Sequence, residues 1–147
     1  MRVCTFLGHR DTPKEAEPHL YTALADLIRN KGVDLFYVGN NGSFDFMVQK
    51  TLNKLKLDYP NIRYFIVLAY MPRKQTAFEH NFENSIYPDG MENTPPKYAI
   101  IKRNKWMIDK SDFVVTYVKR PVGGAAQFKS LAEKKNKTVI NIADLLP

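Results

Sequence analysis

Short apolar runs that end at a glycine alternate along this chain with stretches of helical periodicity, and this alternation limits the possible folds more than any other feature. Residues 2–7 form the first run, which stops at Gly8, and residues 35–38 form the second, which stops at Gly39. Strands are likewise expected at 62–68, 113–118 and 138–142, with a short extended piece at 85–87. Continuous apolar runs of this length are typical of buried strands in a parallel sheet.

Helices are expected in the segments between these strands. Thr12-Pro13-Lys14-Glu15 has the pattern of a capping box with proline at the first helical position, and Gly32 is placed to end that helix in a left-handed conformation. Ser43 is expected to cap a second helix. Two further helices are predicted from Pro96 to about Lys110 and from Gly123 to about Asn136. The predicted fold class is therefore α/β, a single Rossmann-like domain of residues 1–147 with a mainly parallel sheet and helices on both faces.

Length, cysteine content and hydrophobicity restrict the function classes. The chain has 147 residues, of which 44% are hydrophobic, and this suits one domain with an apolar core. Its one cysteine, Cys4, excludes an intramolecular disulfide and a multi-cysteine zinc site, and it fits a reducing cytoplasm. No apolar run approaches the roughly 18 residues of a membrane span. We expect a soluble cytoplasmic protein without a metal site, a cofactor or a membrane partner.

Basic residues concentrate in the last third of the chain. The formal net charge is +7, and between Lys97 and Lys137 eleven lysines and arginines stand against three acidic residues. Such an excess attracts anions, either nucleotides or a nucleic acid backbone. For the lysines of 129–137 the alternative is a solvated helix face. The chain has no zinc-finger spacing, helix-turn-helix pattern or aromatic RNA-binding motif to support nucleic acid binding.

Three of the predicted strands lead into glycine-rich or polar turns that should meet at one edge of the sheet. Glycines there allow a ligand to approach the backbone, and free amides at a helix N-terminus favour a phosphate. The alternative for each turn is ordinary turn chemistry. The spacing is neither a dinucleotide fingerprint nor a P-loop. The candidate ligand-binding residues in the three turns are Gly8, His9, Arg10, Gly39, Asn40, Asn41, Gly42, Ser43, Gly123, Gly124 and Ala125.

Arg103, Asn104 and Asp45 are further candidates. Arg103 and Asn104 share the helix face that is expected to pack inward, and a buried guanidinium needs a partner. That partner is either a ligand phosphate or ribose, or an internal ion pair with Asp45 or Asp112. Asp45 either recognises a ribose hydroxyl or favours the dipole of its own helix. His9 and Arg10 likewise either bind phosphate or hold their loop by hydrogen bonds.

The connection from Ala69 to Pro96 lacks a sustained period and contains several prolines. Long irregular connections in compact domains often form lids or binding loops. We therefore expect it to border the site.

The order of these motifs resembles the SMF/DprA-LOG (SLOG) superfamily, and within it the YpsA-like branch, over nearly the whole chain. The resemblance implies a Rossmann-like fold, a pocket for nucleotides or nucleotide-derived ligands built from the loops named above, and a homo-oligomer. The matching segments are Gly8-His9-Arg10, Phe36-Tyr37-Val38-Gly39-Asn40-Asn41-Gly42-Ser43-Phe44-Asp45, Ser85-Ile86-Tyr87-Pro88, 102–109 and Gly123-Gly124-Ala125-Ala126.

The catalytic motifs of the LOG branch match only in part. LOG enzymes cleave the N-glycosidic bond of a nucleotide, and they use an arginine before a methionine and a glutamate after a P-G-G-x-G-T turn. Arg103 matches the arginine, whereas the turn here reads Pro121-Val122-Gly123-Gly124-Ala125-Ala126-Gln127-Phe128 and lacks the glutamate. An oxocarbenium-like transition state needs a carboxylate, so this departure argues against that mechanism.

Three functions follow from the sequence as hypotheses. The first is binding of a phosphorylated, nucleotide-type molecule such as an ADP-ribose-like or NAD-derived signal, in a regulatory or sensing role. The second is a nucleotide N-glycosidic hydrolase, with Arg103 and Asp45 as the catalytic candidates. The third is DNA binding, as in the DNA-processing members of the superfamily.

Overall fold

The computed structural model describes residues 1–71 and 84–147. In this part of the chain six strands form one sheet in the order β4-β3-β2-β1-β5-β6, and every neighbouring pair is parallel. The strands are β1 (Arg2–Gly8), β2 (Val33–Val38), β3 (Arg63–Val67), β4 (Ser85–Ile86), β5 (Phe113–Tyr117) and β6 (Thr138–Asn141). The α-helices are α1 (Glu17–Lys31), α2 (Ser43–Asp58), α4 (Pro96–Asp109) and α5 (Gly124–Lys134).

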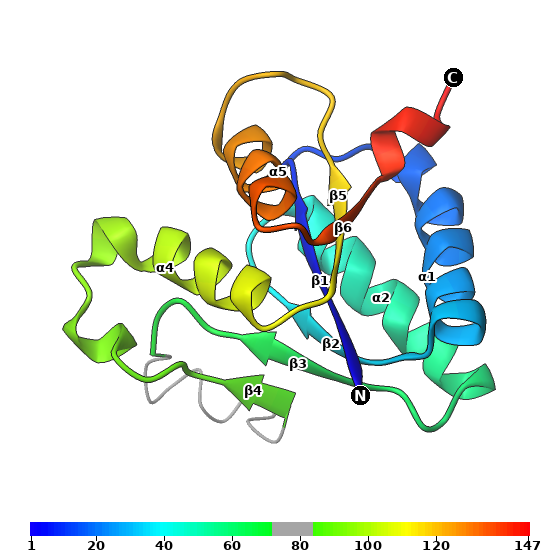
Figure 1. Ribbon diagram of the computed structural model, residues 1–147, viewed down its shortest axis with the longest axis horizontal. Coiled ribbons are helices and arrows are strands. Elements are labelled where there is room, and N and C mark those ends of the chain that lie inside the picture. Colours follow the sequence, from blue (N-terminus) through cyan, green and yellow to red (C-terminus); the bar gives the residue numbers. More distant parts are fainter. Residues whose placement is uncertain (72–83) are drawn as a thin grey trace.

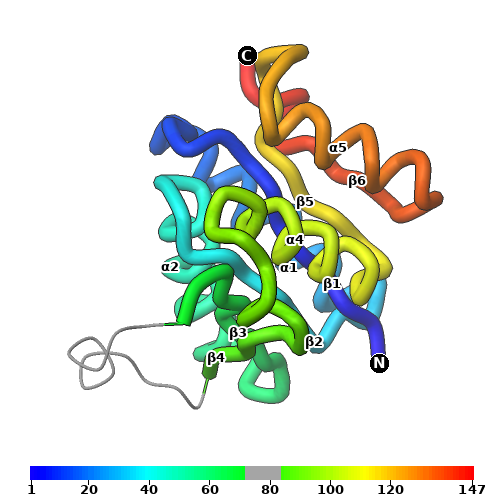
Figure 2. Tube along the Cα trace, turned by 90° about the vertical axis from the view of Figure 1, so that its left-hand side faces the viewer, coloured from blue at the N-terminus to red at the C-terminus, as the bar shows by residue number. Residues whose placement is uncertain are grey.

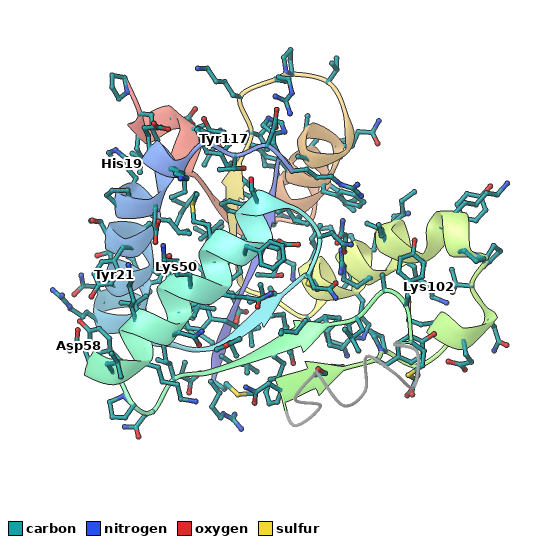
Figure 3. The ribbon with its side chains drawn as sticks, turned by 180° about the vertical axis from the view of Figure 1, so that it is seen from behind. His19, Tyr21, Lys50, Asp58, Lys102 and Tyr117 are labelled. Atoms are coloured by element: carbon teal, nitrogen blue, oxygen red, sulfur yellow. The ribbon has the colours of Figure 1, made fainter. Side chains whose placement is uncertain are left out.

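The helices cover the sheet on both faces (Figures 1 and 2). On one face α1 and α2 bury a core that includes Phe6, Phe36 and Phe44, and on the other α4 and α5 bury a smaller one around Met107 and Val114. Seen from behind, α1 and α2 lie side by side across the sheet (Figure 3). The predicted α/β class with a mainly parallel sheet is confirmed.

The strand order reverses beside β1. From β1 the chain builds outward through β2, β3 and β4, and then returns to place β5 and β6 on the other side of β1. Open α/β sheets have a crevice at such a reversal, beyond the carboxyl ends of the two strands, because the following loops separate there. The fold therefore places the candidate loops after β1 and β5 on either side of a crevice.

Two predicted helix caps are wrong. The Thr12 hydroxyl donates to the His9 carbonyl at 2.6 Å and makes no capping box; residues 14–16 form a 3-10 turn, and α1 starts at Glu17. The Ser43 hydroxyl donates to the Thr12 carbonyl at 3.1 Å and caps no helix. The Thr12 hydroxyl thus makes a local bond within the β1–α1 loop, whereas the Ser43 hydroxyl joins the start of α2 to that loop.

Most other element predictions agree with the structure. Gly32 ends α1 with φ of 69°, the left-handed conformation that the sequence predicts. Each of the later strands and helices lies within two residues of its predicted bounds. Of the connection 69–96, the described part contains β4 and a 3-10 turn at Met91–Asn93, and residues 72–83 lie outside the described residues.

Gly8 is required by packing against a phenylalanine ring. A Cβ at Gly8 would lie 2.5 Å from Cγ and Cδ2 of Phe44, whose side chain is 1% exposed. Gly8→Ala should therefore lower the free energy of unfolding by about 1–3 kcal/mol, the usual cost of overpacking a core. Urea denaturation measures this, and Gly124→Ala is the control because a Cβ there meets no atom within 4 Å. Equal stabilities of the two variants would contradict the packing role.

Candidate functional site

A pocket of about 470 Å³ lies beyond the carboxyl ends of β1 and β5, where the strand order reverses. It is bounded by α4 and the start of α5. The structure brings ten of the candidate residues to its wall: Gly8, His9, Arg10, Asn41, Asp45, Arg103, Asn104, Gly123, Gly124 and Ala125. Gly39, Asn40, Gly42 and Ser43 are not among the residues that line it. The predicted convergence of three loops thus occurs, whereas ligand binding by these residues stays a prediction.

Arg103 is buried and its guanidinium contacts neutral oxygens. The side chain is 2% exposed, as its predicted inward face requires. Its donors reach the Val67 carbonyl at 3.1 Å and the side-chain oxygens of three asparagines, Asn40 at 3.4 Å, Asn41 at 3.0 Å and Asn104 at 2.8 Å. It makes no ion pair with Asp45 or Asp112, so that alternative is wrong; Asp112 accepts the Val3 amide instead. Arg103 therefore fixes the β2–α2 loop (residues 39–42) against the end of β3.

Asp45 is a buried carboxylate in the pocket wall. Its side chain is 8% exposed and accepts the Asn41 amide at 2.8 Å. Burial raises the pKa of Asp45 to about 6, although the Asn41 amide and the positive charge of Arg103 act in the opposite direction. The carboxyl group is therefore partly protonated near neutral pH.

The glycines of the β2–α2 loop make room for the protein's own atoms. A Cβ at Gly39 would lie 2.7 Å from the Asp45 carboxylate and 3.2 Å from the Arg103 guanidinium. Gly42 has φ of 93°, and a Cβ there would lie 2.8 Å from the Arg10 backbone. For these two residues, as for Gly8, close internal packing accounts for the missing side chain.

The turn before α5 is open. Gly123 has φ of 104°, and a Cβ at Gly123 or Gly124 would meet no atom of residues 1–71 or 84–147 within 4 Å. The first turn of α5 has no side-chain cap and no acidic residue. A helix N-terminus leaves its first amides unpaired and carries a partial positive charge, so this turn presents donors to an anion. Of the three loops, this one matches a phosphate-binding turn.

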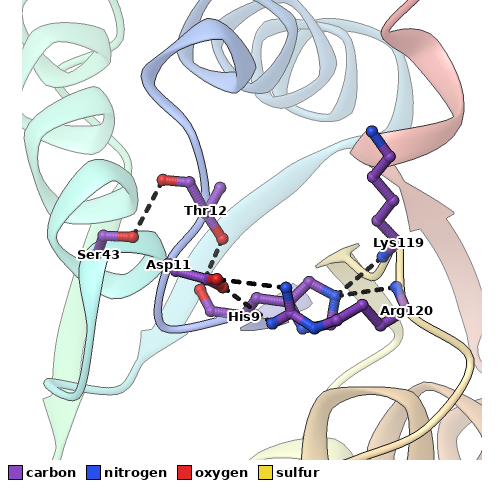
Figure 4. A network of polar contacts seen from close by, with 6 residues as sticks. All are labelled: His9, Asp11, Thr12, Ser43, Lys119 and Arg120. Atoms are coloured by element: carbon purple, nitrogen blue, oxygen red, sulfur yellow. Dashed lines mark hydrogen bonds and ion pairs between the residues drawn. The ribbon is translucent and has the colours of Figure 1, made fainter.

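A hydrogen-bond network joins the three loops, and His9 lies at its centre (Figure 4). Nε2 of His9 accepts the amides of Lys119 at 2.9 Å and Arg120 at 3.3 Å, both in the β5–α5 loop (residues 118–123). The His9 carbonyl accepts the Thr12 hydroxyl, and the Thr12 carbonyl accepts that of Ser43. Of the two roles expected for His9, the structure shows the one in which it holds loops by hydrogen bonds.

Sequence reasoning missed several residues of the pocket wall. Asp11 and Arg120 form an exposed ion pair, with two contacts of 2.9 and 3.3 Å, that bridges the β1–α1 loop (residues 9–13) and the β5–α5 loop. Ile100, Met107 and Phe128 supply an apolar side. The helical spacing of Ile100 with Arg103 and Met107 was a usable signal, whereas none linked Asp11 to Arg120, 109 residues away. The described residues of 69–96 do not line the pocket, contrary to expectation.

Removing the charge of Asp45 should change how stability depends on pH. Because the folded pKa is raised from 3.8 to about 6, the contribution of Asp45 to stability is complete below pH 3.8 and is lost as the pH rises through about 6. Asp45→Asn keeps an acceptor for the Asn41 amide. Near pH 8 its free energy of unfolding, measured by urea denaturation, should exceed that of the parent by on the order of 1–3 kcal/mol. Near pH 4 this difference should disappear. A constant difference between the two proteins would contradict the assignment.

No protein-family model and no curated protein matches the chain. Two solved structures share its fold. DNA processing protein A of Streptococcus pneumoniae aligns with a TM-score of 0.67 and 13% identity, over 95% of this chain and 49% of its own. The protein of the same name from Helicobacter pylori, described with a single-stranded DNA binding mode, aligns with a TM-score of 0.63 and 18% identity, over 94% and 63%. This chain thus spans less than two thirds of either protein.

At these identities the likeness concerns the fold. None of the helices in the described ranges is long and apolar enough to cross a membrane. The YpsA-like branch and the homo-oligomer stay predictions. The chain has the Rossmann-like α/β fold of the DNA processing protein A structures, as its resemblance to the SLOG superfamily predicts.

Proposed function

We propose that this chain binds a phosphorylated, nucleotide-type small molecule in the pocket between α4 and α5, with the phosphate at the first turn of α5. The observation that carries the proposal is that open turn. A Cβ at either of its two glycines would meet no described atom within 4 Å, and the turn has no acidic or capping side chain. Arg10 lies in the same wall and adds positive charge, whereas the charge of Arg120 there is offset by its ion pair with Asp11. Backbone amides at a helix start together with arginines are a common arrangement for binding phosphate.

The remainder of the wall suits a nucleoside. Ile100, Met107 and Phe128 offer apolar contact to a base, and Asp45 with Asn41 offers acceptors and donors to ribose hydroxyls. A volume of about 470 Å³ falls in the ordinary range of small-molecule pockets. We propose a mononucleotide or an ADP-ribose-like molecule as the ligand, in a regulatory or sensing role.

Binding is favoured over N-glycosidic hydrolysis. Phe128 of α5 stands about where the LOG branch carries its glutamate, and the first turn of α5 contains no acidic residue either. Asp45 and Arg103 remain the catalytic candidates. However, the guanidinium of Arg103 donates to asparagine side chains and a backbone carbonyl. These bonds favour a role in holding the β2–α2 loop.

A valine at Gly124 should block the phosphate position. Its branched side chain would occupy the open space in front of the α5 amides and displace the ligand, and its Cβ would meet no atom of the described residues within 4 Å. We expect Gly124→Val to weaken binding of AMP or ADP-ribose by about tenfold or more in titration calorimetry, with unchanged urea stability. Ser130→Val, an exposed position on the same helix, is the matched control. Equal affinities of Gly124→Val and Ser130→Val would contradict the proposed site.

Single-stranded DNA is the second candidate ligand, because the Helicobacter pylori protein that shares this fold is described as binding it. The lysine-rich last third of the chain would contact the backbone. Against this, Arg120, Lys129 and Lys135 pair with acidic residues and Arg103 is buried, which reduces the positive charge that a polyanion would meet.

DNA binding by the lysine-rich segment should weaken steeply with salt, since each phosphate contact releases a counterion. Fluorescence anisotropy of a labelled oligonucleotide across a salt series measures this slope. We expect weak binding that AMP does not compete away. Tight binding with a steep slope, lost on AMP addition, would favour DNA as the ligand of the pocket.

A further inference from the structure

His9 lies in the β1–α1 loop at the pocket wall, and its imidazole bonds to the backbone of the β5–α5 loop. The residue is 7% exposed, and its Nε2 accepts two amides of the β5–α5 loop, from Lys119 and Arg120. An imidazole nitrogen that accepts hydrogen bonds carries no proton, so His9 is neutral here with its proton on Nδ1. The geometry of the β5–α5 loop therefore depends on the protonation state of one side chain.

The consequence reaches the open turn of α5 directly. Arg120 is followed by only Pro121 and Val122 before Gly123, whose φ of 104° turns the chain into α5. The backbone of His9 also belongs to the network, because its amide donates to the Tyr117 carbonyl at 3.2 Å. His9 thus bonds to the end of β5 at Tyr117 and fixes the β5–α5 loop at Lys119 and Arg120, shortly before the amides to which we assign the phosphate.

We propose that His9 is a positioning residue for the phosphate-binding turn, and that addition of a proton to its Nε2 releases this turn and weakens ligand binding in acid. This inference rests on the proposed function. A proton at Nε2 converts the acceptor that the two amides share into a third donor facing them. Two backbone hydrogen bonds are then lost, and the loop gains the freedom to move away from α5.

The groups around His9 support a neutral imidazole. Burial lowers its pKa below the ordinary 6.5, the guanidinium of Arg120 lowers it further, and Asp11 raises it. The ring edge of Tyr117 packs against it at 6.0 Å between centroids. Because the folded pKa is lowered, the stabilisation by His9 is complete above about pH 6.5 and is lost as the pH falls through the folded pKa.

Two substitutions separate positioning from mere packing. His9→Gln places an amide oxygen close to the position of Nε2, an acceptor that does not titrate, whereas His9→Ala removes the acceptor. With AMP as the probe near pH 8, we expect His9→Gln to bind within about threefold of the parent. His9→Ala should bind about tenfold more weakly, because the two backbone hydrogen bonds that hold the turn are lost.

The pH profile gives the decisive comparison. The phosphate of AMP and Asp45 both titrate near pH 6, and they do so in the parent and in His9→Gln alike. The ratio of the two affinities therefore isolates His9. We expect the parent to lose affinity relative to His9→Gln as the pH falls below 6.5 and through the folded pKa of His9, by about fivefold or more once the imidazole is protonated. Parallel profiles would overturn the proposal.

A measurement without ligand keeps this test independent of the proposed function. Amide hydrogen exchange of residues 119–126, corrected for the intrinsic pH dependence of exchange, should show protection that falls in the parent towards pH 5 and is retained in His9→Gln. If the parent does not bind AMP near pH 8 but its loop loses protection in acid, the proposed ligand is wrong and the role of His9 stands. Protection that falls equally in both proteins would refute that role.

Discussion

The buried guanidinium of Arg103 is the constraint on which the pocket depends. A charged group 2% exposed to solvent is tolerated only when its donors are satisfied, and here the partners are three asparagine oxygens and one strand carbonyl. These bonds hold the β2–α2 loop against β3 and leave the Gly39 position without space for a side chain. One side of the pocket is thus a rigid wall of internal contacts, and the first turn of α5 on the opposite side is open.

The fold could be predicted from the sequence because its signals are local. Apolar runs that end at glycine, and helical repeats that end at residues such as Gly32, specify elements within a few neighbouring positions. Alternating strands and helices then leave few topologies to consider. The predictions of the two helix caps failed because both side chains have other acceptors. Thr12 donates to the His9 carbonyl within its own loop, and Ser43 donates to the Thr12 carbonyl, which only the tertiary structure brings near.

The candidate site was predictable as a location and less so in the roles of its residues. Convergence of the loops follows from parallel topology, which places the carboxyl ends of β1, β2 and β5 together. The topology does not predict which glycines are needed for packing and which are open. That depends on whether Phe44, Asp45 or open solvent lies opposite each Cα. The same is true of His9, whose acceptor meets amides 110 and 111 residues further along the chain.

The central claim is that the first turn of α5 holds the phosphate of a nucleotide. Titration of ¹⁵N-labelled protein with AMP, followed by amide chemical shifts, tests it most directly. The account predicts that the largest shifts occur at Gly124, Ala125 and Ala126, with small shifts along the outer lysines of α5. Shifts concentrated on Lys129, Lys134 and Lys135, or no shifts at saturating AMP, would contradict it.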